Sequence, residues 1–289
     1  MARLTNCIFC EEKTKLTGEH VYWPDWSKKY VRPAPKGSHY REIFSTSAKD
    51  PNIRGLKNRS RHHGEVNSIK LQTVCERRCN NGWMRERENL TRPILLPIIQ
   101  GLPAIMDRAA QEKLAAWFVM KSMVAEFSQP DDVATPQKSR TRFMQTGIIQ
   151  NRWLIFAGHT QSPRWRMAYT RNSVKLGRSV NGSPITPHAG SLEKNTYAVT
   201  VGFGELIIWA VCTTVPGLQY EPPVHIRRYM HQIWPYQRGF LWPPGPIVGD
   251  SFASILAELL HTSTKNIPWT DDAGAGKPQE APDEPQPET

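Results

Sequence analysis

The feature that most constrains this fold is two pairs of cysteines that lie far apart in the chain. Cys7 and Cys10 have the spacing C-x-x-C, and Cys75 and Cys79 follow with three residues between them. A C-x-x-C turn brings two thiolates to one ion, and structural Zn²⁺ commonly takes four such ligands. We therefore predict one structural zinc bound by all four cysteines. The wider second spacing leaves open that one ligand is another residue, and a lone C-x-x-C is also compatible with a structural or redox pair.

The start of the chain favours this metal interpretation. Residues 1–6 lead directly into Cys7 without an apolar segment, and no stretch reaches the ~18 apolar residues that span a bilayer. The longest candidate, Leu114 to Phe127, is interrupted by Lys121 and Glu126. We expect a cytoplasmic protein without membrane contact, and in that compartment paired cysteines are typically metal ligands rather than disulfides.

The charge of the chain is distributed unevenly. The net charge is +11, but residues 270–289 hold six acidic residues against one lysine and carry −5, which leaves +16 on the rest. A strongly basic body indicates a polyanionic partner such as nucleic acid, because each cation near a phosphate releases a counterion. A solubility effect is the plainer alternative. We expect the acidic, proline-rich residues 270–289 to be a disordered tail.

The segments near the cysteines predict two strands and a helix. Val21 and Tyr22 favour a strand that ends at Pro24, and residues 68–74 alternate apolar and polar side chains on the way to Cys75. A helix is expected to start near Asn80 and to stop before Pro93. Between the strands, residues 27–65 are rich in Lys, Arg, Pro and Gly, and we interpret them as a basic, mostly irregular insertion along a phosphate backbone or a solvated loop.

The remaining residues predict a second region built from helices and strands. Residues 93 to about 128 are expected to be helical, and the broad apolar stripe of Ala109 to Phe127 indicates a helix central to a second core. Turn-bounded apolar runs predict an antiparallel sheet from strands at 147–149, 153–157, 165–169, 196–201 and 206–212. A short helix is expected at 250–261. The predicted fold class is α+β, with domains at 1–92 and 93–269 and a tail at 270–289.

Three motifs taken together resemble a known family. They are the C-x-x-C pair, the run Glu19–His20–Val21-x-x-Pro24-x-Trp26, and the run Val74–Cys75-x-x-x-Cys79–Asn80–Asn81–Gly82–Trp83–Met84 with Glu88 following. They are similar to bacterial and phage HNH endonuclease-like proteins with a four-cysteine zinc site. The helix at Leu114–Trp117 and the two later Trp-Pro pairs resemble longer members of that group.

The resemblance implies a ββα-metal fold and a set of residue roles. Glu19 would be a ligand of a divalent cation, His20 the general base, and Asn80 a second ligand of the cation. The middle residue of the motif, which orients the base, would be Asn67. The alternatives are Asn58, His62 and His63. Adjacent residues of a strand point to opposite faces, so Glu19 and His20 serve different tasks unless the strand is bulged or ends there.

The residue types agree with phosphodiester hydrolysis. Histidine accepts a proton near neutral pH, and Mg²⁺ or Mn²⁺ prefers oxygen ligands, whereas soft thiolates select zinc. We therefore expect a DNA endonuclease, acting on double-stranded DNA rather than RNA, that nicks as a monomer, in a phage, mobile-element or antiviral defence context with possible partner proteins. The alternatives are a catalytically silent zinc-ribbon DNA-binding protein and a structural partner in a multi-protein system.

Overall fold

The computed structural model describes residues 5–31, 38–46, 54–63, 69–150, 152–174, 177–178, 184–185, 194–215 and 222–263. Within these ranges, side chains are described everywhere except at 38–46, 54–58, 60–63, 177–178, 184–185 and 258–263. The predicted disordered tail at 270–289 lies outside the described residues.

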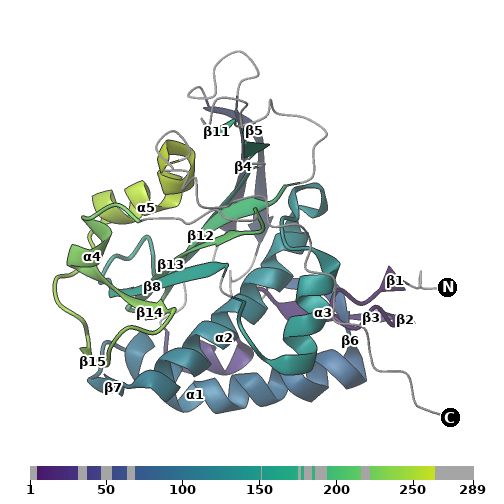
Figure 1. The fold of residues 1–289 in the computed structure, drawn as a ribbon, viewed down its shortest axis with the longest axis horizontal. Coiled ribbons are helices and arrows are strands. Elements are labelled where there is room, and N and C mark those ends of the chain that lie inside the picture. Colours follow the sequence, from purple (N-terminus) through teal and green to yellow (C-terminus); the bar gives the residue numbers. More distant parts are fainter. Residues whose placement is uncertain are drawn as a thin grey trace, which may run out of the picture.

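Strands and helices alternate irregularly along the chain (Figure 1). The first strands are β1 (Thr5–Asn6), β2 (Lys13–Thr14), β3 (Leu16–His20), β4 (Ser38–Thr46), β5 (Arg54–His63), β6 (Lys70–Cys75) and β7 (Ala104–Met106). The later strands are β8 (Trp153–His159), β9 (Met167–Val174), β10 (Gly177–Arg178), β11 (Pro184–Ile185), β12 (Thr196–Phe203), β13 (Leu206–Thr213), β14 (Met230–Trp234) and β15 (Phe240–Trp242). The helices are α1 (Arg85–Ile99), α2 (Arg108–Ala125), α3 (Gln137–Thr146), α4 (Ile226–Tyr229) and α5 (Asp250–Ser263).

The N-terminal region contains two paired strands followed by a helix, but the first strand ends at His20, so the strand expected at Val21 and Tyr22 is wrong. β3 and β6 pair antiparallel, with a register shift between Thr17 and Gly18. After β6 the chain forms a wide helical turn over Glu76–Met84 and continues directly into α1. The helical segment therefore begins before Asn80, and the expectation that it stops before Pro93 is wrong.

The helix α1 continues through Pro93 and Pro97 to Ile99. A proline inside a helix costs a backbone hydrogen bond and crowds the preceding turn. Here Leu95, Ile98 and Ile99 are buried in the core, and α1 packs along α2. Tertiary burial outweighs the local penalty, which is why the proline rule placed the helix end too early.

The predicted irregular insertion also contains regular structure. Residues 25–29 form a 3-10 turn, and β4 pairs antiparallel with β5. The expectation of a mostly irregular segment is therefore wrong, because charged side chains do not prevent a two-stranded ribbon whose backbone groups pair with each other. In this ribbon Asn58 lies opposite Ile43 and His62 opposite His39.

The later strands form one antiparallel sheet in the order β14-β8-β13-β12-β9. The expected strands at 153–157, 196–201 and 206–212 are confirmed as β8, β12 and β13, and the helix expected at 250–261 is confirmed as α5. The strand expected at 165–169 begins later, at Met167. The strand expected at 147–149 is wrong, because Gly147 adopts a left-handed conformation that ends α3.

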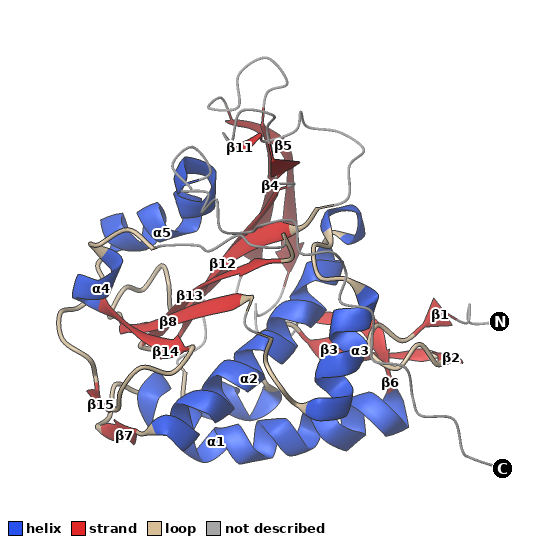
Figure 2. Ribbon diagram, in the orientation of Figure 1, coloured by secondary structure: helices blue, strands red, loops and turns tan. Residues whose placement is uncertain are grey.

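The two faces of this sheet bury different side chains. Side chains that alternate along β8, β12 and β13 join the main core with α2, whereas their neighbours form a second apolar cluster with α5. Figure 2 shows α1, α2 and α3 on one side of the sheet and α4 and α5 on the other. The mixed helices and antiparallel sheets are compatible with the predicted α+β class.

The main core is continuous across the predicted domain boundary. α1 runs across residue 92, and buried residues of the N-terminal region, such as Phe9 and Trp23, belong to the same cluster as Trp117 and Phe203. The division into domains at residue 92 stays a prediction. Within the described part of the chain, no helix is long and apolar enough to cross a membrane.

Candidate metal centre and neighbouring charged cluster

Four cysteines from separate segments meet at one end of the β3–β6 pair, and we call them the thiol centre. Cys7 and Cys10 lie in the turn between β1 and β2, Cys75 is the last residue of β6, and Cys79 lies in the helical turn that follows. All four Sγ atoms are within 4.8 Å of one another. The Cys7–Cys79 and Cys10–Cys75 Sγ distances are 3.6 Å and 3.4 Å.

These distances match the geometry that a tetrahedral zinc ion requires. With Zn–S bonds of about 2.3 Å, the edge of an ideal sulfur tetrahedron is ~3.8 Å. Three of the four cysteines are buried and Cys10 is partly buried, as in closed structural sites. The thiol centre therefore has the ligands and the spacing that could hold one metal ion, and its soft ligands favour zinc. The spacing-based prediction that all four cysteines converge is confirmed.

The pKa values of three of the thiols in this centre are shifted in different directions. The hydrogen bond between Cys7 and Cys79 lowers the pKa of Cys7 to about 4, and burial raises the pKa of Cys75 to about 12. The same hydrogen bond, together with burial, raises the pKa of Cys79. Binding of zinc to four thiolates releases the thiol protons, so burial makes these thiols depend on a metal to ionise together.

Side chains of helix α3 form hydrogen bonds with the backbone of the turn that contains Cys7 and Cys10. The carbonyl of Ile8 accepts hydrogen bonds from Gln137 Nε2 and Arg140 Nε, each at 2.9 Å. The carbonyl of Phe9 accepts one from Thr141 Oγ1 at 2.8 Å. These side chains recur on one face of α3. The cysteine turn is thereby attached to α3, a contact that the sequence did not indicate.

A buried charged cluster lies at the other end of β3, and we call it the Lys121 cluster. The Lys121 ammonium is fully buried and forms ion pairs with both Glu19 and Glu88. The backbone carbonyl of His20 lies 3.4 Å from Lys121 Nζ. Three segments therefore meet here: β3, α1 and α2.

In the Lys121 cluster, burial and ion pairing shift the pKa values of the charged groups in opposite directions. Burial raises the pKa of Glu19, and the charge of Lys121 counteracts this. Burial disfavours the Lys121 ammonium, but attraction to Glu88 and Glu19 outweighs it, so the pKa of Lys121 is raised. The lysine is therefore charged at neutral pH.

Sequence reasoning missed Lys121 as a site residue although its signal was visible. A lysine that interrupts an otherwise apolar helix is fully buried only with partners. The same holds for Glu126, which is buried and accepts hydrogen bonds from Thr135 N and Oγ1. What the chain could not reveal is which acidic residues face Lys121.

The His20 side chain leaves the strand in another direction. Its Nε2 lies 3.1 Å from Asp25 Oδ1, in a contact that is too oblique for a hydrogen bond. Burial lowers the pKa of His20 to about 4, against the opposing charge of Asp25. The imidazole is therefore neutral at physiological pH. Asp25 also contacts Lys28 and Lys70, so it is part of an ionic network at the surface.

The predicted site residues are brought together only in part. Asn80 Nδ2 donates to the Gly18 carbonyl at 3.5 Å, which places Asn80 beside the β3 segment that carries Glu19 and His20. Glu19 and His20 pair regularly with Leu71 and Lys70, because the register shift of the strand lies earlier, between Thr17 and Gly18. Asn67 lies outside the described residues, as do the side chains of Asn58, His62 and His63.

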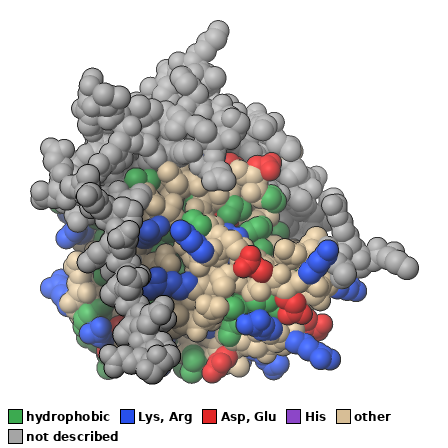
Figure 3. Space-filling view, turned by 45° about the vertical axis from the view of Figure 1, so that its right-hand side comes forward, with side chains coloured by type: hydrophobic (Ala, Val, Ile, Leu, Met, Phe, Trp, Pro, Cys, Tyr) green, Lys and Arg blue, Asp and Glu red, His purple; other side chains and the backbone are tan. Residues whose placement is uncertain are grey.

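One face of the molecule illustrates how mixed its charge is. In Figure 3 the blue Lys and Arg side chains are interspersed with red Asp and Glu side chains rather than forming one continuous patch. The excess positive charge of the sequence is therefore distributed over several separate places on the described part of that face.

Comparisons with known proteins found no match: no protein-family model, no curated protein and no solved structure matches this chain.

Proposed function

We propose that this protein is a zinc-stabilised endonuclease that hydrolyses phosphodiester bonds of DNA. The single observation that supports this best is the local arrangement of β3, β6 and α1. A four-thiol centre lies at one end of the strand pair, Glu19 and His20 are the last two residues of β3, and Asn80 lies beside that strand at the Gly18 carbonyl. Phosphodiester hydrolysis needs a proton acceptor and oxygen ligands close together, and these residues supply both.

His20 is the proposed general base. Because its pKa is held near 4, the imidazole is unprotonated at neutral pH and free to accept a proton from water. The water oxygen then bonds to phosphorus while the bond to the 3′ oxygen breaks. Asp25, 3.1 Å from Nε2, stabilises the imidazolium that forms. A base with a pKa near 4 is weaker than one near 7, and an approaching phosphate would raise the pKa of His20.

The side-chain oxygens of Asn80 and Glu19 are the kind of ligand that a hard divalent cation prefers. The amide of Asn80 donates through Nδ2 and keeps its oxygen as an acceptor, and Glu19 pairs with Lys121 through Oε1 only. Two oxygen ligands suit Mg²⁺ or Mn²⁺, which takes its other ligands from water and phosphate. Lys121 would weaken binding of a second cation, so we expect this ion to bind together with the nucleic acid.

The Lys121 cluster also favours a second candidate function. A buried ammonium that already neutralises Glu19 leaves that carboxylate without need of a metal ion. On this alternative the protein is a catalytically silent, zinc-stabilised nucleic-acid-binding scaffold. Both candidates retain the thiol centre and differ in whether His20 performs chemistry.

A plasmid-nicking assay separates the two candidates. The zinc-loaded full chain is incubated with supercoiled DNA, with or without added Mg²⁺ or Mn²⁺. We expect metal-dependent nicking that His20→Ala reduces by about 10²- to 10⁴-fold. His225→Ala, a change at an exposed histidine on the N-terminal side of α4, is the matched control and is expected to cut normally.

Zinc content and circular dichroism show whether His20→Ala is folded. Undiminished nicking by a folded His20→Ala protein would exclude His20 as the base. Binding of DNA by the wild type without nicking in any metal would favour the silent scaffold. Replacement of plasmid by RNA of matched length tests the preference for DNA.

A further inference from the structure

The second face of α3 borders a surface cleft that the proposed nuclease site does not use. One face of the helix binds the cysteine turn through Gln137, Arg140 and Thr141. The other contributes to an open cleft of about 560 Å³, which we call the α3 cleft. Its lining residues are Lys138, Ser139, Arg142, Ile148, Ile149, Gln150 and Arg152.

The α3 cleft is lined by cations without acidic residues among its described lining. Lys138 and Arg142 are exposed and lie one helical turn apart, and Arg152 is exposed just before β8. Within the described residues, no carboxylate forms an ion pair with any of these three. Their charge is therefore available to an anion from outside.

Arg140, on the same helix, provides a contrast. It is buried, its guanidinium donates to the Ile8 and Thr135 carbonyls, and it lies 4.9 Å from the centre of the Phe127 ring. Arg140 is thus used internally to hold the fold. Among the described residues, the Arg152 side chain by comparison makes one long hydrogen bond, from Nη1 to the Thr214 carbonyl at 3.4 Å. The difference marks Lys138, Arg142 and Arg152 as cations with no comparable structural task.

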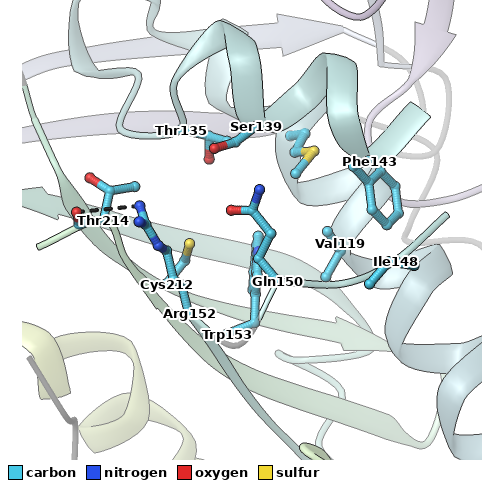
Figure 4. Close-up of a pocket in the computed structure, with 11 residues that line it drawn as sticks. Val119, Thr135, Ser139, Phe143, Ile148, Gln150, Arg152, Trp153, Cys212 and Thr214 are labelled. Carbon is cyan, nitrogen blue, oxygen red and sulfur yellow. Dashed lines mark hydrogen bonds between the residues drawn. The ribbon is translucent and has the colours of Figure 1, made fainter. Parts of the chain in front are cut away.

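The depth of the cleft limits what kind of ligand it takes. Adjoining it is a narrow neck, shown in Figure 4, that shares Ser139 and Gln150 with the cleft and is also lined by Phe143, Trp153 and Cys212. The volume of this neck is only about 10 Å³, which is roughly the space of one water molecule. A nucleobase cannot enter it. A ligand must therefore lie along the open part, among the cations and the polar groups of Ser139 and Gln150.

We propose that the α3 cleft binds the phosphodiester backbone of a nucleic-acid strand. Exposed cations beside hydrogen-bonding side chains, in an open cleft without an acidic lining residue, are the chemistry of contact with a phosphate backbone. This proposal rests on the proposed function in one respect, the choice of nucleic acid as the class of ligand. It does not depend on the chemistry at His20. Helix α3 lines the α3 cleft with one face and contacts the cysteine turn of the thiol centre with the other.

Binding measured against salt concentration tests the proposal. Zinc-loaded full chain without added Mg²⁺ or Mn²⁺ is titrated into a fluorescent 20-base-pair DNA, and anisotropy is recorded from low to moderate salt. Each phosphate contact contributes ~0.9 to the slope of log affinity against log salt. The triple variant K138Q/R142Q/R152Q is expected to lower that slope by ~2 to 3 and to weaken binding at low salt by at least about tenfold.

A charge-matched variant controls for the loss of three positive charges. R164Q/R227Q/R228Q removes three exposed arginines from other parts of the surface and is expected to change the slope by less than ~1. Both variants alter exposed side chains, and unchanged melting curves and zinc content identify folded protein.

Three outcomes would overturn the proposal. The first is an unchanged slope in K138Q/R142Q/R152Q, and the second is an equal loss in the control variant. The third is displacement of the DNA by inorganic phosphate or AMP at micromolar concentration, which would make the cleft a small-anion site. Because no cleavage is measured, an inactive His20→Ala variant or a catalytically silent wild type leaves this test intact.

Discussion

The thiol centre and the Lys121 cluster lie at opposite ends of the same strand, β3, and differ in what completes them. The thiol centre gathers four ligands and contains no cation of its own. The Lys121 cluster gathers two carboxylates around a buried ammonium that belongs to the protein. The first cluster therefore has the ligands for an external metal ion, whereas in the second the chain itself supplies a cation to its two carboxylates.

This difference shows that a buried ionisable group needs a partner of opposite charge or a proton. Buried thiolates without a counter-ion are unstable, so protons or zinc must accompany them. Buried carboxylates are stable as anions only beside a cation. Lys121 supplies that cation from α2.

The largest expected effect is the loss of zinc. Cys79→Ser should lower the zinc content from one to near zero per chain and unfold the N-terminal region, because structural zinc contributes ~10 kcal/mol or more to such sites. Metal analysis and thermal melting by circular dichroism measure both effects. Cys212→Ala, at a buried cysteine of β13 outside the thiol centre, is the control and should retain zinc. Full zinc content in Cys79→Ser would show that another ligand replaces it.

The next effect concerns the cation of the Lys121 cluster. Lys121→Met should lower the free energy of unfolding by about 3–5 kcal/mol at pH 7, because it leaves Glu19 buried and unpaired. Urea unfolding measures this change. The double variant E19Q/K121M should recover part of the loss. If Lys121→Met is as stable as the wild type, the two carboxylates do not rely on the lysine.

A smaller effect is the pH dependence contributed by His20. Its pKa is depressed to about 4 in the folded state and is ~6.5 when unfolded. Protonation therefore favours the unfolded state: the contribution of His20 is present in full above pH ~6.5 and is lost as the pH falls toward 4. The total is at most about 3 kcal/mol.

Unfolding free energies measured between pH 4 and 7.5 test this sign. His20→Gln should have a shallower slope than the wild type over that window, while both slopes above pH 7 should agree. A His20→Gln slope identical to that of the wild type would mean that the imidazole is not buried in its neutral form.

The smallest expected effect concerns the connection between α3 and the thiol centre. Thr141→Ala removes the hydroxyl that donates to the Phe9 carbonyl at 2.8 Å and should cost about 1 kcal/mol. If α3 and zinc binding are coupled, zinc affinity should fall by several-fold, as measured by competition with a chelator. Thr146→Ala, whose hydroxyl bonds within its own helix to the Arg142 carbonyl, should leave zinc affinity unchanged.

The sequence predicted much of the regular structure for reasons that can be stated residue by residue. The apolar stripe around Leu114 and Trp117 predicted α2, and turn-bounded apolar runs predicted β8, β12 and β13. Failures occurred where local rules met tertiary packing. Pro93 did not end α1, and the run 147–149, apolar enough for a strand, became the end of α3 and the border of a cleft.

The amino-acid sequence by itself determined the thiol centre, because cysteine spacing is a local property and a soft tetrahedral site requires little beyond four thiols in reach. Only the tertiary structure decided that Lys121 lies between Glu19 and Glu88 and that His20 is buried enough to stay neutral. Burial and charge pairing depend on which distant segments meet, and here α2 supplies the cation for acids of β3 and α1. No pattern within any one segment contains that information.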